Sequence, residues 1–126
     1  SKDVQENGKS EKWIYKYSSV GIAVDYYFHA TENSVNFDST SILILDGENL
    51  IVDQYFDSDE AMKIAENNGG KEFRENNINY TIEITLLEPM VPNSDAMWFV
   101  KYKSIKNNNI LHIGINNSTK EVVLYY

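Results

Sequence analysis

Hydrophobic and polar residues alternate over much of this chain, and the alternation predicts β-strands. The clearest run covers residues 78–86, where apolar side chains alternate with Asn, Thr and Glu. A strand of this kind has one buried and one solvated face, as in an antiparallel sheet that is covered on a single side. Shorter runs predict further strands at residues 13–18, 22–31, 98–103, 110–115 and 121–126.

A β-hairpin is predicted between residues 42 and 52. Ile42 begins a run of four consecutive aliphatic residues, which is followed by Asp46-Gly47 and then by the apolar residues 50–52. Asp-Gly favours the tight turns that join two strands of a hairpin. Four aliphatic residues in a row indicate a central strand that is covered on both faces.

One helix is predicted, over residues 57–68. Asp57 can cap the free amides of the first turn, and Glu60 stands three residues on, where it can complete a capping box. Gly69-Gly70 predicts the end of the helix, because glycine readily adopts the left-handed conformation of a C-terminal cap. A narrow apolar stripe should pack on the sheet, and it is formed by Ala61, Ile64 and Ala65.

Chain length and these elements together predict one α+β domain. A chain of 126 residues is long enough for one well-buried core. Residues 1–12 are polar, with Val4 as their single large aliphatic residue, and we expect them to form a flexible leader. Residues 13–126 are then expected to form a single α+β domain, an antiparallel sheet with one principal helix packed on a face.

The acidic character of the chain restricts its partners. The formal net charge is −8, whereas nucleic acids and anionic membranes attract basic patches, so we expect neither as a partner. No cysteine is present, which excludes disulfides and thiol nucleophiles. No apolar run approaches the roughly 20 residues of a membrane-spanning helix. We expect an exported form to carry a leader or lipid anchor upstream of residue 1.

No residue pattern points to catalysis, to a cofactor or to a metal. Residues 57–60 resemble the start of a calcium loop, but Met62 and Asn68 replace the glycine and the glutamate that such a loop needs. His29 and His112 are the only imidazoles, and neither has a second ligand at a suitable spacing. The Gly-x-Ser-x-Gly pattern of serine hydrolases is missing. We therefore expect a protein that is not an enzyme.

Tyrosines are the strongest candidates for an interaction surface. The chain has nine, and tyrosine combines a rigid apolar ring with a polar tip that suits protein interfaces. An equally simple interpretation makes them half-buried positions of a sheet. The candidate interaction surface comprises Tyr15, Tyr17, Tyr26, Tyr27 and Tyr102.

Three segments in the second half of the chain resemble a known module. They read DSDEAMKIAENNGG, MWFVKYKS and ILHIGINNSTKEVV. Together they resemble the PepSY-like domain of bacterial secreted proteins and lipoproteins, and the likeness extends over residues 56–126. The matching positions are Asp59, Glu60, Ala61, Ile64 and Ala65 in the helix, Trp98, Val100 and Tyr102 in the strand, and Thr119, Glu121 and Val122 in the turn. The turn departs from the family at Asn116 or Asn117, where Asp is favoured, and at Lys120, where Gly is favoured.

The resemblance implies a PepSY/cystatin-like fold, an extracytoplasmic location and no catalytic residues. It also implies a non-enzymatic binding domain, secreted or surface-anchored, that binds or inhibits a protease or a cell-wall component. The net charge of −8 keeps an alternative open, an acidic immunity-type protein that neutralises a basic toxin in the cytoplasm. A weaker alternative is a small-molecule carrier with a pocket between helix and sheet.

Overall fold

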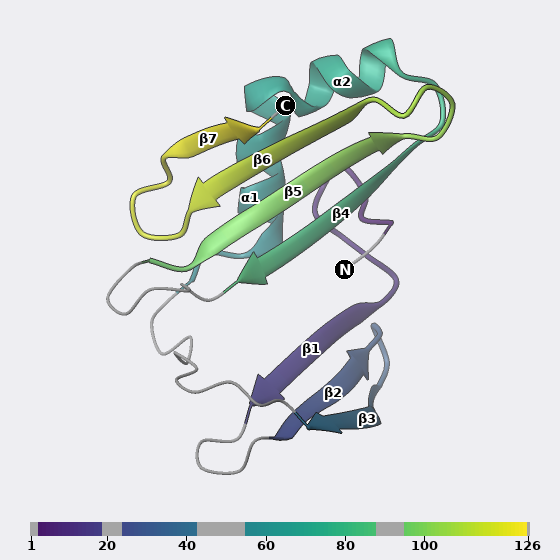
Figure 1. The fold of residues 1–126 in the computed structure, drawn as a ribbon, viewed down its shortest axis with the longest axis vertical. Coiled ribbons are helices and arrows are strands. Elements are labelled where there is room, and N and C mark those ends of the chain that lie inside the picture. Colours follow the sequence, from purple (N-terminus) through teal and green to yellow (C-terminus); the bar gives the residue numbers. More distant parts are fainter. Residues whose placement is uncertain (1–2, 19–23, 43–54, 88–94, 126) are drawn as a thin grey trace. The chain divides into compact units, whose positions relative to one another are not determined.

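The computed structural model describes residues 3–18, 24–42, 55–87 and 95–125, and their fold is α+β. Contacts divide the chain into two compact units, which are described separately. Unit 1 comprises Ser1–Ser10 and Ile51–Tyr126, and unit 2 comprises Glu11–Leu50. Figure 1 labels the helices and strands of both units.

Unit 2 contains a three-stranded antiparallel sheet in the order β1-β2-β3. Its strands are β1 (Trp13–Ser18), β2 (Val24–Ala30) and β3 (Val35–Ile42). The register between β2 and β3 shifts between Tyr27 and Phe28. The first two strands confirm the predictions for residues 13–18 and 22–31. The predicted hairpin lies, apart from Ile42, outside the described residues.

Unit 1 contains a four-stranded antiparallel sheet in the order β4-β5-β6-β7. The strands are β4 (Tyr80–Leu87), β5 (Met97–Ser104), β6 (Ile110–Asn116) and β7 (Val122–Tyr125). Each lies within two residues of a predicted strand. Ile82 and Ile84 of β4 are buried, which confirms the face expected for them, whereas Ile78 precedes the strand and is exposed.

The strands therefore form two sheets and not the one sheet that we expected. Alternation along a strand shows which side chains share a face, but it does not show which strands pair. Among the described strands, pairing stops at β3 and starts again at β4, and the helical segment lies between them in the sequence.

The helical segment begins where the sequence predicts. Asp57 has extended backbone angles, and its Oδ1 accepts a hydrogen bond from the Ser58 amide at 2.7 Å, which confirms the N-terminal cap. The expected capping box is not formed as predicted, because the Glu60 carboxylate pairs with the Lys120 ammonium instead.

The left-handed stop predicted at Gly69 is present, but a second helix follows it directly. α1 (Ser58–Ala65) continues through a distorted turn, Glu66–Gly70, into α2 (Lys71–Asn76). Gly69 adopts a left-handed φ of 111°, as a cap glycine would, but helical geometry resumes at Gly70. The helix is thus interrupted where we expected it to stop, and the second helix, α2, is the part that the sequence analysis did not predict.

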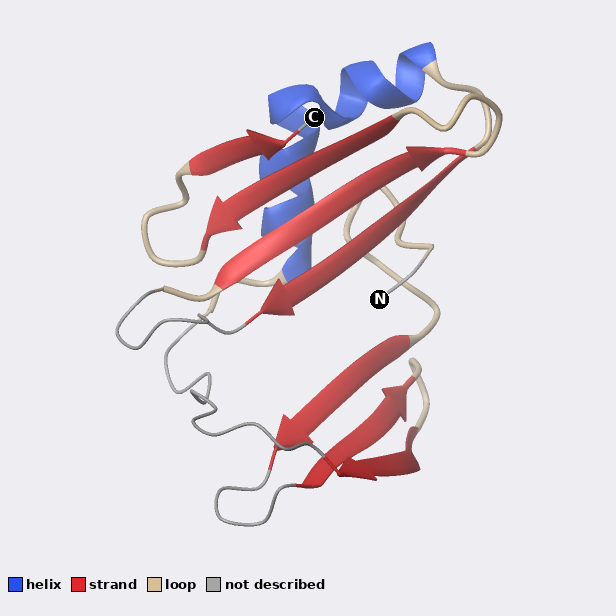
Figure 2. Cartoon of the chain, in the orientation of Figure 1, coloured by secondary structure: helices blue, strands red, loops and turns tan. Residues whose placement is uncertain are grey.

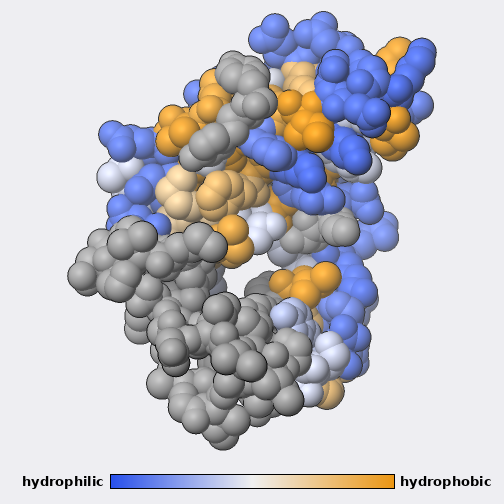
Figure 3. Space-filling model, in the orientation of Figure 1, coloured by the Kyte–Doolittle hydropathy of each residue, from blue (hydrophilic) through white to orange (hydrophobic). Residues whose placement is uncertain are grey.

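The helical segment covers one face of the four-stranded sheet, as Figure 2 shows in blue and red. Short helices are marginal alone, so burial against the sheet stabilises this one. The opposite face carries apolar side chains among polar ones (Figure 3), with Leu87 and Val123 partly exposed. The core of unit 1 contains Ala61, Met62, Ala65, Ile82, Ile84, Trp98, Val100, Tyr102, Leu111, Ile113 and Ile115.

Candidate interaction site

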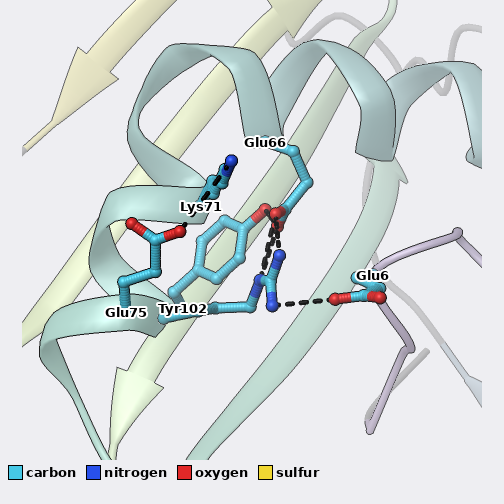
Figure 4. A network of polar contacts seen from close by, with 6 residues as sticks. Glu6, Glu66, Lys71, Glu75 and Tyr102 are labelled. Carbon is cyan, nitrogen blue, oxygen red and sulfur yellow. Dashed lines mark hydrogen bonds and ion pairs between the residues drawn. The ribbon is translucent and has the colours of Figure 1, made fainter.

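A partly buried polar network fastens the bent helix to the sheet. The Glu66 carboxylate accepts hydrogen bonds from Arg74 Nε at 3.0 and 3.2 Å, and a further one from Arg74 Nη2. The hydroxyl of Tyr102, on β5, donates to Glu66 Oε1 at 2.8 Å. Figure 4 shows the Tyr102 ring reaching between the turns of the helix toward Glu66. The network therefore joins both sides of the bend to one central strand.

Two members of this network, Tyr102 and Arg74, have raised pKa values. Burial raises the pKa of Tyr102, and the adjacent Glu66 carboxylate raises it further. The hydrogen bond with Glu66 likewise raises the pKa of Arg74. Tyr102 thus stays a neutral donor and Arg74 stays a cation, which suits a structural role and not proton transfer.

Gly70 makes the approach of Tyr102 to the helix possible. A Cβ atom at residue 70 would overlap the Tyr102 hydroxyl and would lie 2.6 Å from its Cζ. Any other residue would push the tyrosine away from Glu66. Because Gly69-Gly70 is also typical of a helix end, the sequence pattern did not reveal this second role.

Residues 3–10 contact the same part of unit 1. Val4 is 4% exposed, and its amide donates to the Ile82 carbonyl of β4 at 3.0 Å. Glu6 Oε2 lies 2.8 Å from Arg74 Nη1, and Figure 4 shows it facing the network from the N-terminal trace. Part of the segment that we expected to be a leader is therefore in contact with the fold.

Two shallow surface depressions flank Lys63 on the helix. They have volumes of about 490 and 510 Å³ and are lined mainly by charged and amide side chains, with Ile64 as the single apolar one. Pockets for small molecules are mostly apolar and enclosed. The described part of the chain thus gives a small-molecule carrier no support.

Tyr102 does not belong to the candidate tyrosine surface. It is 0% exposed and lies in the core, because its ring packs under the helix and its hydroxyl is bound by Glu66. Tyr27 of β2 is half-buried. The side chains of Tyr15, Tyr17 and Tyr26 lie outside what the structure describes.

An apolar face is nevertheless exposed on unit 2. Val35 and Phe37 of β3 are 69% and 58% exposed. The register pairs them with Ala30 and Phe28 of β2, so the four lie on one face of the sheet. The rings of Phe28 and Phe37 meet edge to face, with centroids 5.7 Å apart. We call these four residues the β2–β3 apolar face.

The other face of the same strands is polar. His29 Nε2 lies 3.6 Å from Asp38 Oδ2, which gives one of the two histidines a carboxylate neighbour. His112 of β6 is exposed. No group of three or more His, Cys, Asp or Glu that could hold a metal ion occurs among the described residues.

In the same described ranges, no helix has the length and apolar character that crossing a membrane requires. No protein-family model matches the chain, and no match was found among curated proteins or among solved structures. The PepSY-like resemblance consequently stays a prediction from the sequence.

Proposed function

We propose that this protein is a non-enzymatic binding domain that works outside the cytoplasm and binds or inhibits a protease or a cell-wall enzyme. The β2–β3 apolar face is its contact surface. The single observation that carries the proposal is the exposure of Val35 and Phe37, at 69% and 58%, side by side on one sheet face.

Exposed apolar residues in a contiguous group favour a protein partner. Isolated apolar side chains on a surface are ordinary, whereas a group that includes aromatic rings is typical of protein interfaces. Phe28 and Phe37 meet edge to face, so each ring has one aromatic neighbour on the exposed face. Rigid aromatic anchors of this kind contribute strongly to binding energy.

The turn between β6 and β7 supports the PepSY-like part of the proposal. Asn116 Oδ1 accepts hydrogen bonds from the amides of Ser118 and Thr119, both at 2.8 Å, which is the role an aspartate would have there. Lys120 has a left-handed φ of 60°, the conformation for which glycine is best suited. The two departures from the family pattern thus retain the backbone geometry that the pattern favours.

Asp95 accounts for an asparagine at residue 116. The side-chain Nδ2 of Asn116 donates to Asp95 Oδ2 at 3.0 Å, and the Ser118 hydroxyl donates to Asp95 Oδ1 at 2.7 Å. The bond from Ser118 and then the bond from Asn116 lower the pKa of Asp95. An aspartate at residue 116 would place a second negative charge against this carboxylate.

The competing function is an acidic immunity-type protein that neutralises a basic toxin, and the net charge of −8 favours it. Binding dominated by charge weakens steeply as salt rises, because salt screens exposed charges. Contact through apolar side chains is far less sensitive to salt.

The test is affinity capture with the tagged full chain from envelope and cytosolic fractions of the source organism, washed at low and at high salt. We expect an envelope protease or cell-wall enzyme that survives the high-salt wash. A basic cytosolic protein that is released by salt would refute the proposal in favour of the immunity function.

A further inference from the structure

Val4 is buried at the outer edge of the four-stranded sheet. β4 is the end strand in the order of that sheet, and the Val4 amide donates to its Ile82 carbonyl at 3.0 Å. The side chain is 4% exposed. A backbone bond to an edge strand combined with a side-chain pocket is how many domains recognise a peptide segment.

Glu6, two residues later, has an exposed side chain that pairs with the Arg74 guanidinium. Arg74 uses Nε and Nη2 for Glu66, and it directs Nη1 to Glu6 Oε2 at 2.8 Å. A guanidinium that is held in place by one carboxylate is a preorganised donor for a second one. The guanidinium therefore prefers an acidic side chain at this position of the segment.

Gly8 makes a third contact, at a position where only glycine fits. A Cβ atom there would lie 2.6 Å from Asp59 Cα, and the backbone has a left-handed φ of 79°. The Ser58 hydroxyl donates to the Gly8 carbonyl at 3.3 Å. The first turn of α1 thus selects glycine both by shape and by backbone conformation.

The segment itself forms a compact turn. The Gln5 amide donates to the Lys9 carbonyl at 2.8 Å, and the Gly8 amide donates to the Gln5 carbonyl at 2.9 Å. These bonds lie within the segment, so a separate peptide of the same sequence could form them as well. The contacts at Val4, Glu6 and Gly8 join the segment to the rest of unit 1.

We propose that the outer edge of β4, Arg74 and the first turn of α1 form a peptide-binding site that the chain's own residues 4–8 occupy. From a partner protein it takes a segment with an aliphatic residue, then an acidic residue two positions later, then a glycine two positions after that. The site is built from unit 1 alone, and it does not depend on the function proposed for the β2–β3 apolar face.

The test uses an acetylated peptide with the sequence of residues 3–10 and a fluorophore at its C-terminal end. Its anisotropy is measured with the full wild-type chain and with a full-chain Gly8→Val variant, whose own segment no longer fits. In the wild type, the attached segment competes at an effective concentration of order millimolar. We expect the variant to bind the peptide at least about ten-fold more tightly than the wild type.

Val4→Asp serves as a second full-chain variant. It also displaces the segment from the sheet edge, and it leaves the residues that the segment contacts unchanged. Peptides that carry the Glu6→Lys or the Val4→Asp change should bind either variant at least about ten-fold more weakly than the native peptide. Circular dichroism of each chain shows whether it is folded.

Three results would overturn the proposal. The first is equal, weak binding of the native peptide to all three folded chains. The second is loss of the folded state in both variants, which would make the segment an indispensable part of the fold. The third is a wild-type dimer that exchanges its N-terminal segments, because the site would then bind residues 4–8 of a second copy of the chain.

Discussion

Three side chains, two from the helical segment and one from β5, join the helical segment of unit 1 to its sheet. Glu66 precedes the bend, Arg74 follows it, and Tyr102 reaches both from β5. Each bond in this network involves at least one ionised group, and such bonds stabilise a protein more than neutral ones do. A group that loses its partner while buried destabilises it correspondingly.

Tyr102→Phe removes a single donor from the network. The ring keeps its packing, but Glu66 Oε1 loses the hydroxyl that lies 2.8 Å away. We expect the free energy of unfolding to fall by about 1–2 kcal/mol in urea denaturation, because a buried hydrogen bond to a charged group is lost. Tyr55→Phe is the matched control at an exposed tyrosine and should change it by less than about 0.5 kcal/mol. Equal effects of the two changes would contradict the structural role.

The same tyrosine should make the protein sensitive to alkali. Burial raises the pKa of Tyr102 in the folded state, whereas a tyrosine in the unfolded chain has a pKa of about 10. Below that pH the contribution of Tyr102 is complete. Above it the unfolded state loses the proton first, so the contribution falls by about 1.4 kcal/mol per pH unit until the folded pKa is reached.

The difference in unfolding free energy between wild type and Tyr102→Phe should therefore narrow above about pH 10. Urea denaturation of both chains at about pH 8 and about pH 11 measures it, and the other tyrosines are common to both. A difference that stays constant over this range would show that Tyr102 is not held neutral by its surroundings.

At the scale of elements, one lysine combines an unfavourable backbone conformation with two tertiary contacts. Lys120 has a φ of 60°, its ammonium pairs with Glu60 of α1, and it lies 5.6 Å from the centroid of the Phe56 ring. A left-handed residue other than glycine costs about 1–2 kcal/mol. The contacts to the start of the helix offset part of this cost.

Alanine and glycine at residue 120 separate these effects. Both lose the contacts of the lysine side chain, but only alanine keeps the strained backbone, so Lys120→Gly should be more stable than Lys120→Ala by about 1 kcal/mol. Lys103, an exposed position within strand β5, is the control, and there alanine should be the more stable of the two. Thermal denaturation of the four variants gives the answer, and the same order at both positions would rule out strain at Lys120.

Periodicity was enough to locate most elements. The alternation around Ile82 and Ile84 located β4, and Asp57 located the start of the helix, because each signal depends on neighbours in the sequence. The signal of Gly69-Gly70 located the interruption of the helix, but it did not predict the helix that follows or the bond between Glu66 and Tyr102, which are 36 residues apart. Local patterns carry no information about such a contact.

At the scale of the whole molecule, the α+β class was predictable and the division into sheets was not. Residues 13–19 (WIYKYSS) and 98–104 (WFVKYKS) have similar sequences. However, β1 pairs only with β2 among the described strands, whereas β5 is central in its own sheet. The sequence predicted that an aromatic interaction surface exists, but it did not predict which residues form it. Five tyrosines suggested a surface, but Tyr102 is buried and does not belong to it, whereas Phe37, which was not predicted, is exposed.

Binding of the partner through the β2–β3 apolar face is tested most directly by a comparison of two double variants in the envelope capture. Val35→Ser/Phe37→Ser removes the exposed residues of the β2–β3 apolar face. Ile78→Ser/Ile105→Ser is matched to it, because these residues of unit 1 are 78% and 64% exposed. Circular dichroism establishes that both chains are folded.

If the protein binds its partner through this face, the wild type and the Ile78/Ile105 variant should retain the same envelope protein after the high-salt wash. The Val35/Phe37 variant should lose it by about ten-fold or more. Undiminished capture by a folded Val35/Phe37 variant would contradict the assignment of the contact surface.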